Sequence, residues 1–251
     1  MLRDLLHPLL FGFPVPPEMI GFRFPEFFYR VGGLSLTVMI TLPSLVIGML
    51  IGCLLAIFRR KPPRNVPFVL HSIFRSMDFI AAGLVETVRG LPIILLVLLI
   101  FYLPFPLTGL RIPSVILATT AFSLYAGAYF SEIIRSGFRS IPIGLHESGK
   151  ILGLSSFKIF IKIEMPLVVR KMMPDIVNLA VTIFRDTSVL TVVGIAEMTH
   201  TGRQMMISWP VNYGLVLLLM MFLYWFPAVL ISSFLTTRSD GETAFRKPFF
   251  W

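Results

Sequence analysis

The chain of 251 residues alternates between long apolar stretches and shorter basic ones. Five stretches of 20 residues or more carry little or no charge, and they are Leu34–Phe58, Phe79–Leu103, Ile112–Ser131, Met172–Gly194 and Val211–Thr237. A helix needs about 20 apolar residues to cross a bilayer, whereas a strand of a membrane barrel needs about half that number. The pattern therefore predicts an all-α integral membrane protein with five transmembrane helices.

Charged side chains interrupt this pattern at only a few places, in or beside the second, third and fourth stretches. An ionisable group is costly inside a bilayer, so such groups pair with one another or line a water-filled path. Residues next to them carry hydroxyl groups that can hydrogen-bond a polar solute. The candidates for a translocation path are Glu132, Asp186, Thr187, Ser188, Glu86 and Arg89.

Some of these charges have a second interpretation. Glu86 and Arg89 are three residues apart and therefore lie on one face of a helix. An arginine near the membrane boundary can extend to the aqueous interface and only lock helices together. For Arg89 and Arg135 the sequence leaves both interpretations open. Gly90 and Pro92 follow directly, and they predict a break in the second helix that would expose backbone polar groups.

The composition agrees with a membrane location. Hydrophobic residues make up 56% of the chain and charged residues 14%, against about 25% in a typical soluble domain. The mean hydropathy is +0.85. A net charge of +9 could indicate a nucleic-acid-binding protein, but the lysines and arginines cluster in the connections between the apolar stretches. We therefore expect contact with membrane lipid and not with nucleic acid.

The distribution of basic residues predicts the orientation. Fifteen lysines and arginines lie in the connections after the first and third stretches and in the C-terminal tail, and five lie in the other connections. Cytoplasmic loops carry the excess of basic residues. We therefore expect an external N-terminal segment at residues 1–33, a transmembrane domain at 34–237 and a cytoplasmic tail at 238–251. The longest cytoplasmic loop would be 135–171.

Catalytic and metal-binding signatures are absent from the sequence. Cys53 is the only cysteine, and the four histidines are scattered without the spacing of metal ligands. Hydrolase motifs of the G-x-S-x-G or His-Glu-x-x-His kind do not occur. We expect no catalytic site, no metal site and no bound cofactor in this chain.

Gly144–Ile151, which reads GLHESGKI, matches the phosphate-binding pattern G-x-x-x-x-G-K-[ST] except at its last position. Ile151 offers no hydroxyl group for a metal ion, and Glu147 would place a carboxylate beside the phosphates. A membrane helix and a Pro-Gly turn precede the stretch, where a nucleotide-binding loop follows a strand. We infer that this stretch does not bind nucleotide.

The surrounding loop is too apolar for a solvated linker, and it should pack against another protein. We expect two short helices here, the second of which begins near Phe157 and is capped by Ser155. Gly149 and Gly153 would lie between the two helices.

A longer pattern runs through the same loop. Glu147 is followed six residues later by Gly153 and then, after nine more residues, by Ile163-Glu-Met-Pro166. This spacing resembles the E-A-A-x3-G-x9-I-x-L-P signature in the cytoplasmic loop of ABC importer permeases. The departures are Ser148 and Gly149 in place of the two alanines, and methionine in place of leucine.

Three other segments resemble the polar amino acid branch of this family, the histidine, glutamine and arginine permeases. They are Glu86-Thr-Val-Arg-Gly-Leu-Pro92, the segment from Ala128-Tyr-Phe-Ser-Glu-Ile-Ile-Arg135 to Ile141-Pro-Ile-Gly144, and Arg185-Asp-Thr-Ser-Val-Leu190. The resemblance runs from about Leu34 to Thr237. It implies a five-helix core with an external N-terminus in the bacterial inner membrane, which agrees with the count of spans.

The resemblance also implies function and partners. It implies a permease subunit that is coupled to a cytoplasmic ABC ATPase through residues of the loop: Glu147, Ser148, Gly149, Gly153, Ile163 and Pro166. Ile141–Leu154 would form the short coupling helix that rests on the ATPase. The partner ATPase would bind ATP and Mg²⁺. A second permease subunit, the same chain or a sister, would complete the path, and an extracytoplasmic binding protein would deliver the solute.

Two other classes of function stay open at this level. An ion-coupled secondary transporter or channel would use the intramembrane charges without an ATPase, and a structural scaffold would move no solute. The spacing from Glu147 to Pro166 favours the importer over both. The identity of the solute, and the choice between two copies and a pair of sister chains, are not encoded in any motif that we can identify.

Overall fold

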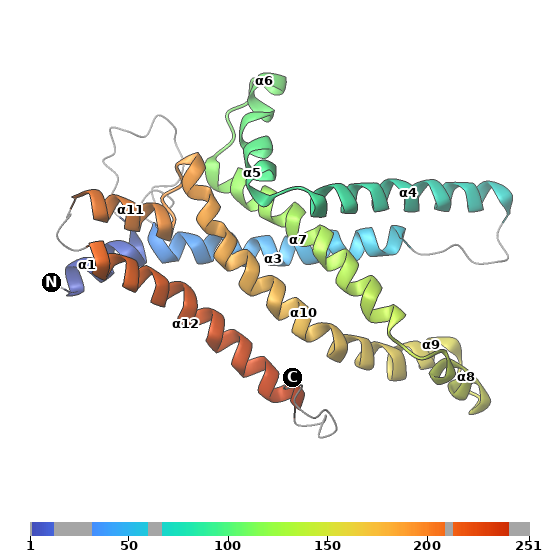
Figure 1. Ribbon diagram of the computed structural model, residues 1–251. Coiled ribbons are helices and arrows are strands. Elements are labelled where there is room, and N and C mark those ends of the chain that lie inside the picture. Colours follow the sequence, from blue (N-terminus) through green and yellow to red (C-terminus); the bar gives the residue numbers. More distant parts are fainter. Residues whose placement is uncertain (1, 13–31, 60–66, 209–212, 241–251) are drawn as a thin grey trace.

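The computed structural model describes residues 2–12, 32–59, 67–208 and 213–240. These residues form helices without any strand (Figure 1). The first part of the chain contains α1 (Leu2–Phe11), α3 (Gly33–Phe58), α4 (Phe68–Gly90), α5 (Ile93–Tyr102), α6 (Pro104–Thr108) and α7 (Ser114–Arg139). The second part contains α8 (Ile143–Ile151), α9 (Ser156–Ile159), the π-helical turn η2 (Phe160–Glu164), α10 (Met165–Asp186), the 3-10 helix η3 (Thr187–Val193), α11 (Met198–Ser208) and α12 (Tyr213–Asp240).

In the described part of the chain, four helical segments are long and apolar enough to cross a membrane, namely Gly33–Phe58, Ser114–Arg139, Ser156–Val193 and Tyr213–Ile231. A bent pair, Leu70–Gly90 with Ile93–Thr108, raises the number to five if it forms one span. This confirms the predicted all-α membrane fold. Several helices are longer than the apolar stretches that predicted them; α7, for example, continues to Arg139. The reason is that charged residues at the membrane boundary lower the hydropathy without ending the helix.

The second predicted span, 79–103, is not one continuous helix. α4 and α5 meet at an angle of 108°, with Leu91 and Pro92 in extended conformations between them. Proline has no N–H to continue the helical ladder, and it drives the preceding residue out of the helical region. A Cβ atom on Gly90 would meet nothing within 4 Å. The expected break is therefore present, and it follows from Pro92 and not from Gly90.

The core of the bundle is the close packing of α3 against α7 (Figure 1). Glycines allow the two backbones to approach, because a Cβ atom on Gly52 would lie 2.5 Å from the Cβ atom of Phe130, and one on Gly127 would lie 2.6 Å from a methyl carbon of Ile51. Small residues serve the same purpose at many helix contacts in membranes. Residues of α4, α5, α10 and η3 complete this core.

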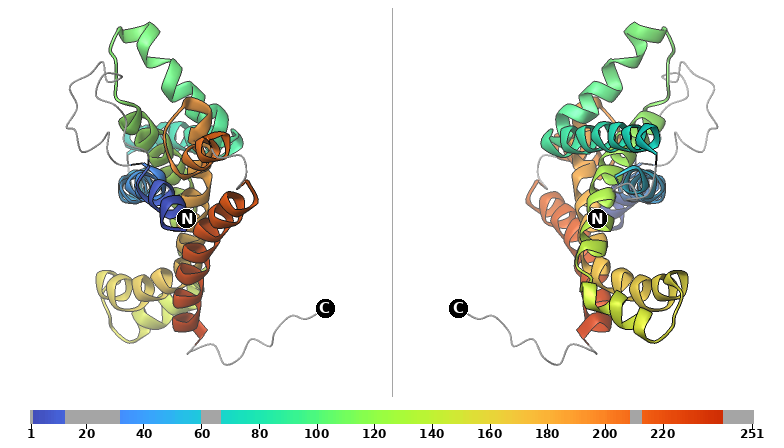
Figure 2. Two further views of the ribbon diagram at one scale, coloured as in Figure 1. Left: turned by 90° about the vertical axis from the view of Figure 1, so that its left-hand side faces the viewer. Right: turned by 90° about the vertical axis from the view of Figure 1, so that its right-hand side faces the viewer.

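Two features extend to opposite ends of the molecule. α8 and α9 project from one end of the bundle, and α5 and α6 rise at the other, as both views in Figure 2 show. A smaller core lies where α1, α11 and α12 meet, and it contains Leu9, Met198, Met205 and Val216. The bundle therefore separates the predicted coupling loop from the α5–α6 end.

Candidate functional site: a coupling segment and two polar clusters

The predicted coupling loop forms two short helices, α8 and α9. α8 begins after Pro142 and ends at Ile151, so it is shorter than the expected 141–154. Glu147 and Ser148 are exposed on it. The Ser155 hydroxyl accepts a hydrogen bond from the Lys158 N–H at 3.4 Å, which confirms the expected cap of α9. The backbone of Gly144–Ile151 is helical, so this stretch does not have the conformation of a phosphate-binding loop.

We expected both glycines of this segment between the two helices, and the structure places Gly153 there but not Gly149. Gly149 lies within α8 and is buried, and a Cβ atom there would lie 2.7 Å from Cγ1 of Ile159 in α9. Gly153 lies between the helices with φ at +74°, and a Cβ atom there would meet nothing within 4 Å. Only Gly149 therefore permits a close approach of α8 and α9, and Gly153 permits the turn.

Polar and aromatic contacts tie this segment to the bundle. Nδ1 of His146 in α8 lies 2.8 Å from Oε1 of Glu164 in η2. The rings of Phe138 and Phe160 stack with centroids 5.9 Å apart, and Lys171 donates to the carbonyl oxygen of Ser140 at 2.8 Å. Ile163 is half-buried next to Glu164, and Pro166 is exposed at the second position of α10. We predicted no role for His146, because its partner is 18 residues away and no local pattern points to it.

The outer surface of the coupling segment is apolar. Ile143 is 78% exposed, Ile151 86% and Phe157 72%. Exposed apolar patches of this kind are typical of surfaces that bind another protein. Together with Glu147, they form a surface that no other part of the described chain covers, although the segment itself contacts α7 and α10.

A cluster of charges joins α3, α4 and α7, with Glu132 at its centre. Nη1 of Arg59 lies 3.1 Å from the Glu132 carboxylate, Nη1 of Arg89 lies 3.8 Å from it, and Arg135 pairs with it from the next turn of α7. Glu86 lies 3.9 Å from Arg59 and 4.0 Å from Arg89. Three of the predicted path residues therefore meet, in contacts between helices as well as within them.

Arg89 is only partly satisfied by this cluster. Its Nε atom is buried without a hydrogen-bond partner among the described residues. Its guanidinium carbon lies 5.4 Å from the ring centre of Tyr129, within the range of a cation–π contact. The cluster thus combines an arginine that has an unused hydrogen-bond donor with the exposed carboxylate of Glu86.

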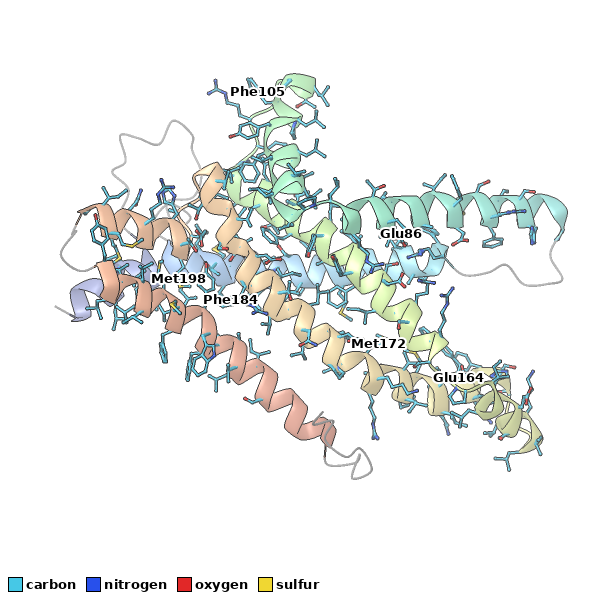
Figure 3. All side chains as sticks on the ribbon, in the orientation of Figure 1. Glu86, Phe105, Glu164, Met172, Phe184 and Met198 are labelled. Atoms are coloured by element: carbon cyan, nitrogen blue, oxygen red, sulfur yellow. The ribbon has the colours of Figure 1, made fainter. Side chains whose placement is uncertain are left out.

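Asp186, Thr187 and Ser188 form a separate polar group. They lie where α10 passes into η3, about 30 Å along the helix from Met165 by the helical rise, at the end away from the coupling segment. Thr187 is buried and donates to the carbonyl oxygen of Phe184 at 2.8 Å. Asp186 and Ser188 are half-buried, and no described residue hydrogen-bonds to the Asp186 carboxylate. Figure 3 labels Phe184 and Glu86 at the two separate places on the bundle.

Glu197 is a buried acidic residue that the sequence pattern did not single out. It is 0% exposed, and its carboxylate accepts hydrogen bonds from Oγ1 of Thr191 at 2.6 Å, the N–H groups of Thr199 and His200 at 2.8 Å, and the hydroxyl of Tyr224 at 3.0 Å. It therefore caps α11 and links it to η3 and α12. A glutamate shortly before a short helix is the only local signal.

Comparison with known proteins places this geometry in context. Residues 66–241 match the family described as the binding-protein-dependent transport system inner membrane component. The chain is 27% identical over 237 residues to the L-cystine transport system permease protein of Bacillus subtilis (strain 168), covering 92% of this chain and 93% of that protein. It is 32% identical over 186 residues to the glutamate/aspartate import permease of Escherichia coli O6:H1, covering 71% and 78%.

Solved structures share the fold. A crystal structure of an amino acid ABC transporter with histidines aligns with a TM-score of 0.69 at 20% identity, covering 82% of this chain and 90% of that one. An inward-facing structure of the MetNI methionine ABC transporter aligns with a TM-score of 0.62 at 17% identity, covering 83% and 94%. The helical arrangement of this chain is therefore that of transporter permeases.

Proposed function

The chain belongs to the family of binding-protein-dependent transport system inner membrane components, and we propose that it carries an amino acid or a similar polar solute. Members of this family are permease subunits of ATP-driven importers, so the chain is a transport subunit and not an enzyme. Such a subunit works with an ATPase and a binding protein. Family membership decides against the ion-coupled transporter and the scaffold.

Two observations support an amino acid as the solute. The names of its relatives refer to cystine, glutamate and aspartate transport. An amino acid also carries one positive and one negative group, and both the Glu132 cluster and Asp186 offer charge within an apolar bundle. Residues at these two places would contact the solute at successive points of its passage, with Thr187 and Ser188 as hydrogen-bonding neighbours.

The observation that carries the coupling proposal is the exposed apolar surface of α8 and α9, in which Gly149 packs α8 against α9 and His146 holds α8 to Glu164 of η2. This surface would rest on the cytoplasmic ATPase, with Glu147 in contact and Ser148, Ile163 and Pro166 in support. The ATPase would bind ATP and Mg²⁺. Its closure would move the segment as a rigid unit and switch the bundle between outward and inward access.

A path that is closed to lipid needs more surface than one bundle supplies. We infer a second permease subunit, either another copy or a sister chain. The basic residues would place α8 and α9 in the cytoplasm and the N-terminus outside, where a binding protein delivers the solute.

The test is the ATPase activity of the complete complex in proteoliposomes, with its own ATPase and its binding protein loaded with single amino acids. We expect one or a few amino acids to stimulate hydrolysis. In Glu147→Arg the stimulated activity should fall at least about tenfold, because a misplaced charge at an interface costs several kcal/mol. The variant should still insert into the membrane and assemble.

Arg203→Glu, a charge reversal on an exposed residue of α11, away from the coupling segment, is the control, and it should retain most of the stimulation. Stimulation by no amino acid would refute the proposed solute class. Normal stimulation in Glu147→Arg, or an equal loss in Arg203→Glu, would refute a specific coupling role for Glu147.

A further inference from the structure

A cleft opens between α3, α7 and the start of α10, and it borders the Glu132 cluster, with which it shares Arg59 and Arg135. Its volume is about 780 Å³, and its walls include Met49 and Cys53 of α3, Phe130 and Ile134 of α7, and Met172 and Ile176 of α10. Met49 is 52% exposed, so the cleft is open on the α3 side. Figure 3 shows Met172 on α10 where this helix runs beside α7. The walls are those of a site for a hydrocarbon chain and not for a polar solute.

All the charge in the walls of the cleft is positive, and it gathers at one end. Arg59 directly follows α3, Arg139 is the last residue of α7, and Arg135 lies one turn before it. These positions are the ends of two membrane-crossing helices, so the three guanidinium groups lie at the depth of lipid head groups.

Acidic neighbours neutralise these arginines only in part. Arg59 and Arg135 share Glu132, which Arg89 also approaches, and Glu86 and Asp78 add two further carboxylates that interact with Arg135. Arg139 has no acidic partner among the described residues. Four arginines therefore face three carboxylates, and positive charge remains at the mouth of an apolar cleft.

We propose that this cleft binds an anionic phospholipid. The acyl chains would lie between α3 and α10, and the phosphate would contact Arg139 together with Arg135 or Arg59. Arginine binds phosphate through paired N–H groups, and basic pockets between membrane helices bind anionic head groups in this way. A zwitterionic lipid fills the apolar part equally well but adds a positive group at the arginines.

The bound lipid would connect the coupling segment to the first span. Phe160 of η2 and Met165 of α10 also line the cleft, and they adjoin Glu164, the partner of His146. An acyl chain held there fills the space between α3 and the base of α10. The lipid would come from the cytoplasmic leaflet, and this assignment rests on the orientation given under the proposed function. Lipid binding itself depends on neither the solute nor the ATPase.

The test is native mass spectrometry of the complete complex, purified and exposed to phosphatidylglycerol or phosphatidylethanolamine. We expect tighter retention of phosphatidylglycerol. Arg139→Gln should weaken it about fivefold, as expected for one basic group at a membrane surface. Cys53→Phe, which narrows the apolar part without changing a charge, should weaken the retention of both lipids. Arg203→Gln, the same change on an exposed arginine of α11, is the matched control and should change nothing.

Three results would overturn the proposal. They are equal retention of the two lipids by the unaltered complex, equal behaviour of Arg139→Gln and Arg203→Gln, and full displacement of phosphatidylglycerol by glycerol phosphate, which has no acyl chain. A cysteine placed at Met49 that cross-links to the second permease subunit would also show that protein, and not lipid, covers the cleft. If the complex fails to retain phosphatidylglycerol but its ATPase is still stimulated by the solute, the lipid proposal is refuted and the proposed transport function is not.

Discussion

The three glycines of the coupling segment differ in what they contribute, and the surroundings of each residue decide this. Gly144 and Gly149 both lie in α8, but a Cβ atom would meet nothing at Gly144 and would meet Ile159 at Gly149. Gly153 adopts a positive φ at the end of the helix. Steric contact therefore matters at Gly149, backbone conformation at Gly153, and neither at Gly144.

This contrast provides a matched pair of substitutions. Gly149→Ala should destabilise the contact of α8 with α9 by about 1–3 kcal/mol, because it overpacks a closed site, and it should lower uptake. Gly144→Ala should be neutral or stabilising by up to about 1 kcal/mol, since alanine favours the helix. Solute uptake and thermal unfolding of the purified complex measure both effects.

A second change checks the steric cause. Ile159→Val removes a methyl group at the point of contact, so uptake by the double variant Gly149→Ala/Ile159→Val should exceed that of Gly149→Ala. If the two glycine variants behave alike, the close approach at Gly149 is not what positions α8.

At the scale of the element, the break between α4 and α5 shows how one residue redirects a span. The apolar stretch is long enough to cross the bilayer as one helix, yet it bends by 108° at Leu91 and Pro92. The bend brings Leu96 and Val97 of α5 into the core with α7 and η3. It also leaves Glu86 and Arg89 at the end of α4, where they meet Arg59 and Glu132.

Substitution at the break should alter the angle. In Pro92→Ala the restraint on Leu91 is lost, so the distance between spin labels at the exposed positions Phe79 and Leu107 should become longer and more broadly distributed. Both variants carry Cys53→Ser, so that only the introduced cysteines are labelled, and Gly90→Ala should leave the distance unchanged. Pulsed electron paramagnetic resonance measures both, and an unchanged distribution in Pro92→Ala would mean that packing alone holds the bend.

At the scale of the molecule, three sets of contacts hold the spans together in a defined order along their length. The His146–Glu164 pair lies at the base, the Glu132 cluster lies between α3, α4 and α7, and Glu197 links η3, α11 and α12. Because each set joins two or more helical elements through side-chain contacts, the bundle can transmit a movement of α8 as a unit.

The orientation of the whole bundle can be tested by labelling. α8 and α9 lie at the end opposite to α6 (Figure 2), so a cysteine at Ser156 should react with an impermeant maleimide only in permeabilised cells, and a cysteine at Thr108 should react in intact cells. The measurement uses the Cys53→Ser chain in the assembled complex. The reverse pattern would place the coupling segment outside and would contradict its contact with a cytoplasmic ATPase.

The properties that the sequence determined alone are those that depend on a run of neighbouring residues. The length of each apolar stretch sets the number of spans, because burying the backbone in lipid requires a helix of that length. Pro92 determines the break and Ser155 the cap of α9, since both act on adjacent backbone groups. The spacing from Glu147 to Pro166 indicated the family, which the comparison confirmed.

Tertiary structure decided which distant residues meet. It united Glu86, Arg89 and Glu132 with Arg59, set Asp186 apart from them, gave Gly149 and not Gly153 the close contact, and surrounded Glu197 with four donors. The physical reason is that the local pattern of apolar residues determines the free energy of transferring a helix out of water. The choice of partner depends on the shapes and charges that two helices present to each other once they are packed.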